Sequence, residues 1–349
     1  MNVEFIEALD DIEREKGVPK DVILDALESA LISSYRKNFG SSQNVEIEID
    51  KDTGEVKVYA KKMVVEEVEN DLTEIDVAEA EGIDEKYQLG DIANIEITPK
   101  DFGRIAAQTA KQVVIQRIKD AERDVIFDEF RNRENEIITG TVQRQSNNNV
   151  YIDLGKTEGI LPYTEQIEGE TYKQGDRIKL FILEVKKTTK GPQIILSRSH
   201  PGVVKRLFEL EVPETHEGIV DIYAISREAG SRTKIAVHSR DPNVDPVGAC
   251  VGFKGSRVKA IVEELNGEKI DIVIWSKDIG EFIANSLSPS KVIKVEVCEK
   301  EKSALVVVPD YQLSLAIGKE GQNARLAAKL TAWKIDIKSE SQYAENLEE

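Results

Sequence analysis

Apolar side chains recur every three or four residues in three parts of the chain. The pattern covers residues 5–12, residues 23–35, where Pro19 precedes the run and Gly40 follows it, and the long segment of residues 101–133. This spacing predicts amphipathic helices, and proline near the start with glycine after the end is their expected punctuation. At 1.5 Å per residue the third helix would be about 50 Å long. Its basic side chains favour a solvated connecting helix, with contact to RNA or a partner as the alternative.

Strands are predicted where apolar and polar residues alternate with a period of two. Residues 44–50 and 54–60 alternate around a turn and predict a hairpin, and residues 91–97 predict a further strand. Residues 134–200 hold five short strand-like segments separated by Gly, Asn and Pro. Five strands in so short a segment predict a small barrel of the OB type, which commonly binds single strands. A barrel that serves only as a spacer is the alternative.

The barrel segment has few aromatic side chains on which a base could stack. They are chiefly Tyr151, Tyr163 and Phe181, and Phe181 lies in an apolar run that predicts a core position. We therefore expect the barrel to bind RNA weakly on its own.

A repeated module fills the last part of the chain. The tetrapeptides GFKG, at residues 252–255, and GKEG, at residues 318–321, each separate a short helical pattern from a longer one. A second tetrapeptide, KIDI, recurs at residues 269–272 and 334–337. Because both pairs recur after nearly the same number of residues, one duplicated unit explains them. Each copy predicts a helix, a Gly-x-x-Gly loop and a helix beside a three-stranded sheet.

The chemistry of these loops points to a phosphate ligand. Glycine lets a backbone approach closely, and the following helix presents unpaired amides with partial positive charge. This is the logic of a KH domain, whose GxxG loop holds about four nucleotides of single-stranded backbone. Glu320 would oppose a phosphate unless its side chain points outward. The candidate RNA-binding residues are Gly252, Phe253, Lys254, Gly255, Arg257, Gly318, Lys319, Glu320, Gly321 and Arg325.

The formal charge is unevenly distributed along the chain. The total of −18 divides into −15 for residues 1–134, +1 for residues 135–200 and −4 for residues 201–349. An acidic first third would be repelled by a phosphate backbone and attracted to a basic protein surface. The asymmetry predicts two surfaces with different partners.

Signatures of catalysis and of metal binding are missing from the sequence. GKEG lacks the P-loop frame, because Gln322 follows Gly321 and Leu313 occupies the upstream glycine position. No HExxH or GxSxG motif occurs. Cys250 and Cys298 have no CxxC partner and the three histidines are far apart, so we expect both cysteines to be small core residues. We expect no enzyme activity, no metal and no cofactor.

Neither a membrane span nor a secretion signal is expected. No segment approaches about 20 consecutive apolar residues. The acidic, helical start of the sequence lacks the basic and apolar regions of a signal peptide. A cytoplasmic location is the resulting expectation.

Several segments resemble the NusA family of bacterial transcription factors. The resemblance extends over essentially the whole chain and implies a multidomain α+β fold. It implies an RNA polymerase-binding domain at residues 1–133 with its connecting helix at residues 101–133, an OB-fold domain of the ribosomal S-one type at residues 134–200, KH domains at residues 201–276 and 277–344, and an acidic tail at residues 345–349. The segments that carry the resemblance are residues 102–118, 154–162, 197–214, 245–252, 265–272 and 315–331.

The resemblance also implies a function. Factors of this family associate with the RNA polymerase core near the RNA exit channel, contact nascent single-stranded RNA, promote pausing and hairpin-dependent termination, and act with other factors in antitermination. Some members continue into acidic repeats after the second KH domain, and activities that depend on those repeats are not expected here. A nuclease that carries KH and S-one modules and a ribosome-assembly chaperone are the alternatives.

Overall fold

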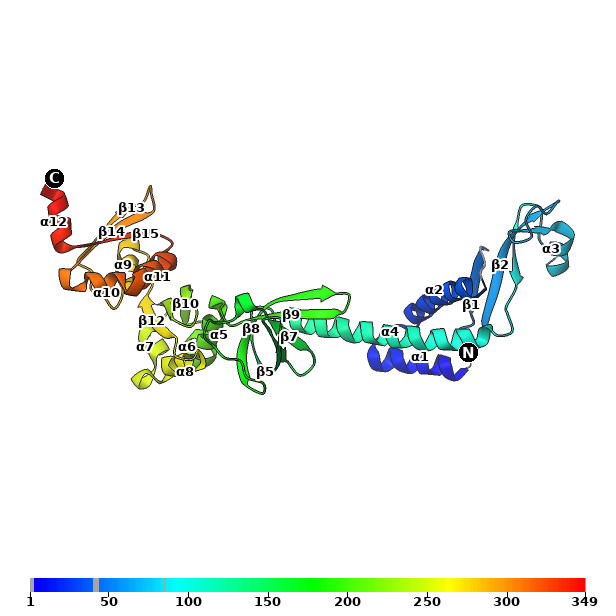
Figure 1. Ribbon diagram of the computed structural model, residues 1–349, viewed down its shortest axis with the longest axis horizontal. Helices are drawn as coiled ribbons and strands as arrows, with labels where there is room; N and C mark the ends of the chain where they lie inside the picture. Colours follow the sequence, from blue (N-terminus) through cyan, green and yellow to red (C-terminus); the bar gives the residue numbers. More distant parts are fainter. Residues whose placement is uncertain (1–2, 40–43, 85, 349) are drawn as a thin grey trace. The chain divides into compact units, whose positions relative to one another are not determined.

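The chain forms two compact units. In this computed structural model, residues 3–39, 44–84 and 86–348 are described, and the units comprise residues 1–126 and residues 127–349 (Figure 1). Within the described part of the chain, none of the helices has the length and apolar character needed to cross a bilayer.

Three helices and a hairpin build the body of the first unit. The helices are α1 (Val3–Lys16), α2 (Lys20–Phe39) and the first part of α4 (Phe102–Arg131), and the hairpin pairs β1 (Val45–Ile49) with β2 (Val56–Val65). The predicted helices and hairpin are therefore confirmed. Their apolar stripes meet in one core because each element buries one face. This core includes Leu9, Leu27, Leu31, Ile47, Val58 and Phe102.

A smaller part of the first unit is built on the second half of β2. There β2 pairs in parallel with β3 (Glu74–Asp76) and antiparallel with β4 (Ile92–Glu96). The short helix α3 (Val77–Ile83) begins after Asp76, whose side chain accepts a hydrogen bond from the Ala78 amide. The sequence predicted β4, but it did not reveal β3 and α3, which are too short to establish a period.

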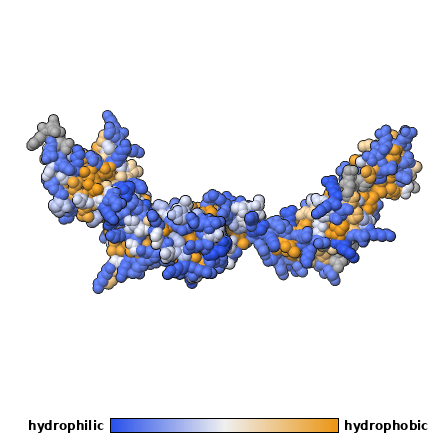
Figure 2. All heavy atoms as spheres, viewed as in Figure 1, coloured by the Kyte–Doolittle hydropathy of each residue, from blue (hydrophilic) through white to orange (hydrophobic). Residues whose placement is uncertain are grey.

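Apolar side chains remain exposed on this smaller part. Met63 and Ile92 face each other across the β2–β4 pair and are 51% and 60% exposed. Figure 2 shows apolar atoms over the visible face of the region that carries α3. The other exposed apolar side chains here are Val68, Leu72, Ile83 and Leu89.

The second unit begins with a closed five-stranded barrel, as the sequence predicted. Its strands follow the order β5-β6-β7-β9-β8 around the barrel. Phe181 is buried, as expected, and its ring stacks on that of His200. The strands are β5 (Ile137–Ser146), β6 (Asn149–Asp153), β7 (Glu158–Leu161), β8 (Arg177–Thr188) and β9 (Gly191–Ser197).

Two modules of the same topology follow the barrel, as the repeat predicted. In each, the first two strands are antiparallel and the strand that begins with KIDI lies parallel to the second. The first module contains α5 (Pro201–Glu211), α6 (Pro213–His216), β10 (Val220–Glu228), β11 (Arg232–Ser239), α7 (Pro246–Val251), α8 (Ser256–Glu264) and β12 (Lys269–Ile274). The second contains α9 (Ile279–Ser286), β13 (Lys294–Cys298), β14 (Ser303–Val308), α10 (Leu313–Ile317), α11 (Gln322–Thr331) and β15 (Lys334–Ser339).

The chain continues after β15 in α12 (Glu340–Glu348). Most of the segment expected to form an acidic tail, residues 345–349, is therefore the end of this helix, and residue 349 lies outside the described residues.

Candidate nucleic-acid interface

The two Gly-x-x-Gly loops have the same backbone conformation. Gly252 has φ and ψ of 74° and 176°, and Gly318 has 78° and 171°. The third residue of each loop is left-handed, with 51° and 28° at Lys254 and 53° and 27° at Glu320. One loop geometry is therefore built twice, although the side chains at the third position carry opposite charges.

Glycine is required at the first position of both loops. Its φ and ψ lie in a region open essentially to glycine alone. An added Cβ would lie 2.7 Å from Cγ of Arg257 at Gly252, and 2.8 Å from Cβ of Asn323 at Gly318. The first glycine of each pair is therefore needed for the backbone conformation of the loop, in addition to leaving room for a ligand.

The second glycine of each loop leaves the start of the next helix open. Gly255 and Gly321 are the residues before α8 and α11, and neither offers a side chain to cap the first amides. No atom lies within 4 Å of the Cβ that either glycine would carry. The first amide of each helix is already paired, that of Ser256 with the Phe253 carbonyl and that of Gln322 with the Lys319 carbonyl. A phosphate could still approach each helix start without steric obstruction, and the helix dipole would favour its charge.

The side chains at the loop tips project into solvent. Phe253 is 82% exposed, and Lys254 Nζ lies 5.4 Å from the centre of its ring. Lys254, Lys319 and Glu320 are also exposed. The first tip thus offers an aromatic face and a cation, whereas the second offers one cation and one carboxylate.

Arg257 is held inside the first module. Its Nη1 atom donates to Oε2 of Glu214 at 2.8 Å and to the Ala249 carbonyl at 2.6 Å. At the matching position of the second module, Asn323 donates to the Ala316 carbonyl at 3.0 Å. Both side chains therefore fix the end of the helix that precedes the loop. The charge of Arg257 is already paired with a carboxylate.

Arg325 connects the two modules. Its Nε atom donates to Oε1 of Glu228 in β10 at 2.6 Å, and this hydrogen bond holds the pKa of Glu228 below its usual value. Gln322 donates to the same carboxylate at 2.9 Å and to Ser231 at 2.8 Å. The second loop is thereby fixed against the β10–β11 turn of the first module.

Lys259 is the counterpart of Arg325 in the first module, and the sequence reasoning missed it. Its side chain is 75% exposed and its nearest carboxylate oxygen, on Glu263, is 3.9 Å away. Applying the glycine offset to Arg325 would have identified this lysine from the sequence. It adds an exposed cation to the helix that follows the first loop.

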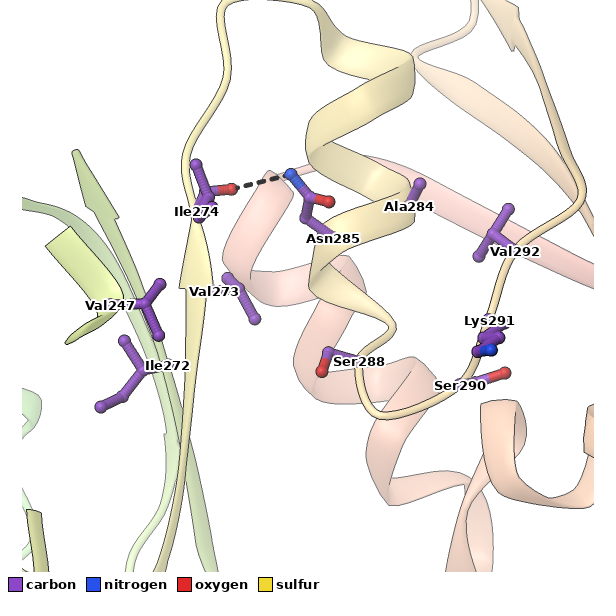
Figure 3. A pocket seen from close by; sticks show the side chains of 10 residues that line it. All are labelled: Val247, Ile272, Val273, Ile274, Ala284, Asn285, Ser288, Ser290, Lys291 and Val292. Carbon is purple, nitrogen blue, oxygen red and sulfur yellow. Dashed lines mark hydrogen bonds between the residues drawn. The ribbon is translucent and has the colours of Figure 1, made fainter. Parts of the chain in front are cut away.

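A pocket of about 510 Å³ lies between the two KH-like modules (Figure 3). Val247 and residues 272–274 of β12 line it from the first module, and residues from α9 and the loop after it line the other side. Asn285 Nδ2 donates to the Ile274 carbonyl at 3.2 Å. Among the described strands, β12 pairs only with β11, so its outer edge faces this pocket and α9 instead of another strand. Apolar walls beside an unpaired strand edge and polar groups suit a nucleobase.

Buried arginines attach the barrel to the first module. Arg198 donates to Glu170 at 2.6 Å and to the Glu264 carbonyl at 3.0 Å. Arg227 of the first module donates to the Arg198 carbonyl at 2.8 Å and is paired with Glu268 of its own module at 2.9 Å, and both side chains of this pair are buried. Burial opposes the charge of Glu268, but the hydrogen bonds and charge of Arg227 outweigh it and lower the pKa of the carboxyl group. The barrel and the first module are therefore joined by a hydrogen-bonded ionic network.

On the barrel, Tyr151 and Tyr163 differ in accessibility. The Arg144 guanidinium carbon lies 3.7 Å from the ring centre of Tyr151, and this arginine also donates to both carboxylate oxygens of Glu158. One face of Tyr151 is thereby covered, whereas Tyr163 is 67% exposed. Tyr163 is the more accessible of the two for stacking.

The cysteine prediction is half correct. Cys250 is buried in the first module, and burial raises the pKa of its thiol to about 11. Cys298 is exposed, so the prediction of a core position is wrong there. It lies at the end of β13, an edge strand whose side chains are mostly exposed.

Comparison with known domain families agrees with this architecture. The chain matches the NusA N-terminal domain over residues 4–124 and the S1 RNA binding domain over residues 131–199. It matches the NusA-like first KH domain over residues 198–275 and the NusA-like second KH domain over residues 279–345.

Curated relatives match over nearly the full chain, and those described here are named transcription termination/antitermination protein NusA. The relative from Halalkalibacterium halodurans is 60% identical over 345 residues, which cover 99% of this chain and 90% of the relative. That from Bacillus subtilis is 60% identical over 341 residues, with 98% and 92% covered. That from Thermus thermophilus is 43% identical over 346 residues, with 96% and 89% covered. Since these matches extend through all four domains, the chain belongs to the NusA family.

Proposed function

We propose that this protein is an RNA polymerase-associated regulator that holds nascent single-stranded RNA in its barrel and its two KH domains. The observation that carries the proposal is the pair of loops with the same backbone, each of which places a sterically accessible helix start beside an exposed lysine. The proposed RNA-binding residues are those of the two loops, together with Arg257 and Arg325. The two arginines act by holding the loops in place.

The three RNA-binding modules belong to one compact unit. Arg198 donates to the Glu264 carbonyl and Arg227 to the Arg198 carbonyl, which links the barrel to the first KH domain. Arg325 links the first KH domain to the second. The domain limits we propose remain residues 134–200, 201–276 and 277–344. Modules fixed in one body engage a single strand together, and RNA that spans several of them gains affinity from the linkage.

The first unit is proposed to dock on RNA polymerase near the RNA exit channel. Its acidic surface disfavours RNA and suits a basic protein surface. A groove of about 470 Å³ between α1 and α4 offers an apolar contact area, lined among others by Ile12, Ala110, Val114 and Ile115. Protein interfaces commonly combine such an apolar centre with a polar rim.

The activity that follows is regulatory. A factor held at the polymerase that also grips the emerging strand can lengthen pauses, promote hairpin-dependent termination and, with other factors, take part in antitermination. We propose that it does this in the cytoplasm, without catalysis and without a cofactor.

The test compares the intact chain with its two units. Phe130 is buried with the second unit, so the fragments should be residues 1–126 and 127–349. The first fragment should bind core polymerase and not RNA, and the second should bind RNA and leave pause lifetimes nearly unchanged. Only the intact chain should prolong a hairpin-stabilised pause. If residues 127–349 alone prolonged the pause equally, tethering would be refuted. Loss of full-length labelled RNA in the presence of Mg²⁺ would favour a nuclease.

A further inference from the structure

Three aromatic rings meet on the sheet of the first KH domain, away from both loops. Tyr223 of β10 and Trp275, the residue after β12, are stacked with ring centres 4.1 Å apart and planes 9° apart. His238 of β11 lies edge-on to both, at 5.7 Å from Tyr223 and 5.3 Å from Trp275. We call Tyr223, His238 and Trp275 the ring cluster.

The position of Tyr223 is set by a β-bulge. The register between β10 and β11 shifts between Ile222 and Ala224, which places Tyr223 at the irregularity. A bulge bends its strand and re-aims a side chain, and bulges are frequent beside functional sites. The bulge turns this tyrosine toward Trp275.

The ring cluster lies where the cover from the second KH domain ends. Ala236 and Val273, on the same sheet, are buried against Phe282 and Leu330 of the second domain. Trp275 packs beside these four buried side chains. Tyr223 is 51% exposed. Trp275 therefore lies between the buried interface of the two KH domains on one side and the exposed ring of Tyr223 on the other.

We propose that Tyr223, supported by Trp275, is a stacking site for a nucleobase of single-stranded RNA outside the Gly-x-x-Gly loops. Stacking needs a flat, supported and accessible ring, and it tolerates any base. The inference rests on the proposed RNA-binding function, because it adds a contact to the same bound strand.

Two further observations favour RNA as the occupant. The ring cluster is continuous with the candidate interface, since Trp275 packs in the same apolar cluster as Val273, which lines the pocket between the KH domains. Cations are also close at hand: Arg240 follows β11 and is exposed while paired with Asp221 at 2.6 Å, and Lys277 lies two residues beyond Trp275 and is exposed. A strand that leaves the pocket along β12 would thus find a ring for a base and cations for its phosphates.

The first experiment measures binding of labelled oligoadenylate to the full-length chain by fluorescence anisotropy. Tyr223→Ala should weaken binding about five- to 150-fold, the range for loss of one stacked base. Because no charge changes, the dependence of affinity on salt should keep its slope. Tyr223→Phe keeps the ring and should bind like the wild type. Leu210→Ala removes another exposed apolar side chain and is the matched control.

The second experiment follows Trp275 directly. The chain has two tryptophans, and Trp333 is partly buried in the second KH domain, so Trp333→Phe isolates the Trp275 signal. Oligoadenylate should change this emission with the same midpoint as the anisotropy curve.

The outcomes separate this proposal from the proposed function. Normal RNA binding by Tyr223→Ala, or unchanged Trp275 emission while anisotropy reports binding, would overturn the stacking site and leave RNA binding intact. If Tyr223→Ala bound RNA normally but altered pausing, the ring cluster would be a protein contact, and the stacking proposal would again be wrong. If the wild-type chain failed to bind any single-stranded RNA, the proposed function would fall as well.

Discussion

The two loops carry side chains of opposite charge at their third position, where Lys254 in the first loop corresponds to Glu320 in the second. Their backbone angles agree within 2°. Glu320→Lys should therefore give the second loop the charge of the first without altering the fold, and it should strengthen RNA binding. A lysine is acceptable at this left-handed position because Lys254 already occupies it in the first loop.

The size of the effect follows from charge and distance. A unit charge at 4 Å from a phosphate in water contributes about 1 kcal/mol, so reversing a charge changes binding by about 1–2 kcal/mol, or about five- to thirtyfold at low salt. Salt reduces this gain, since the Debye length is about 8 Å at physiological ionic strength. One added phosphate contact should also steepen the salt dependence by about 0.7 unit for a single strand.

The assay is a salt titration of affinity for one single-stranded RNA, with Lys254→Glu as the reciprocal change. Lys254→Glu should weaken binding and flatten the slope by a similar amount. Glu301→Lys makes the same charge change at an exposed turn outside both loops and controls for net charge. If Glu320→Lys and Glu301→Lys had equal effects, only the overall charge would matter and the loops would not be phosphate sites.

Three further predictions concern stability and reactivity. Arg198→Ala leaves Glu170 buried without its main partner and should lower the free energy of unfolding by about 3–5 kcal/mol in urea; a loss below about 1 kcal/mol would contradict a structural role for the pair. Gly318→Ala should lower the free energy of unfolding by about 1–3 kcal/mol and weaken RNA binding, because the backbone angles of Gly318 suit only glycine. Gly103→Ala is the control: an added Cβ has free space in α4, so the stability of the chain should stay the same or rise. Iodoacetamide should label exposed Cys298 in the folded chain and Cys250 only after unfolding, as mass spectrometry of the digest would show; rapid labelling of Cys250 would refute its burial.

The elements that could be predicted from the sequence are those with a long or repeated pattern. Helix α4 was expected at residues 101–133 and runs from Phe102 to Arg131. Helices α5 and α12 were not identified, although His200 and Pro201 at the start of α5 are recognisable capping signals. The apolar side chains that α5 buries, Val203, Val204, Leu207 and Phe208, also recur at helical spacing, so this helix was readable from the sequence and was overlooked.

The loops could be predicted because they depend on local backbone geometry. Two glycines at a fixed spacing report positive φ angles whatever the rest of the fold does. The partners of the arginines could not be predicted in this way. Arg257 meets Glu214 across 43 residues and Arg325 meets Glu228 across 97 residues. Such contacts exist only after the modules have folded and packed, so a single sequence gives no local sign of them.

The duplicated modules are therefore alike in backbone and unlike in charge. In the first, Lys254 and Lys259 are exposed at and after the loop, whereas Arg257 is held against Glu214 inside the module. In the second, Arg325 is engaged at the joint and Glu320 opposes Lys319 at the loop tip.

The apolar surface of the helix before each loop shows the opposite asymmetry. Leu315 and Ile317 on α10 are 47% and 38% exposed in the second module, whereas their counterparts in the first, Ala249 and Val251, are smaller and less exposed. Phosphate contacts add a salt-dependent term to affinity, and apolar contacts with bases add a term that salt hardly changes. The lysines of the first KH domain should therefore supply most of the electrostatic attraction for RNA, and α10 of the second should add an apolar contact with bases to those offered by Phe253 and Tyr223 in the first.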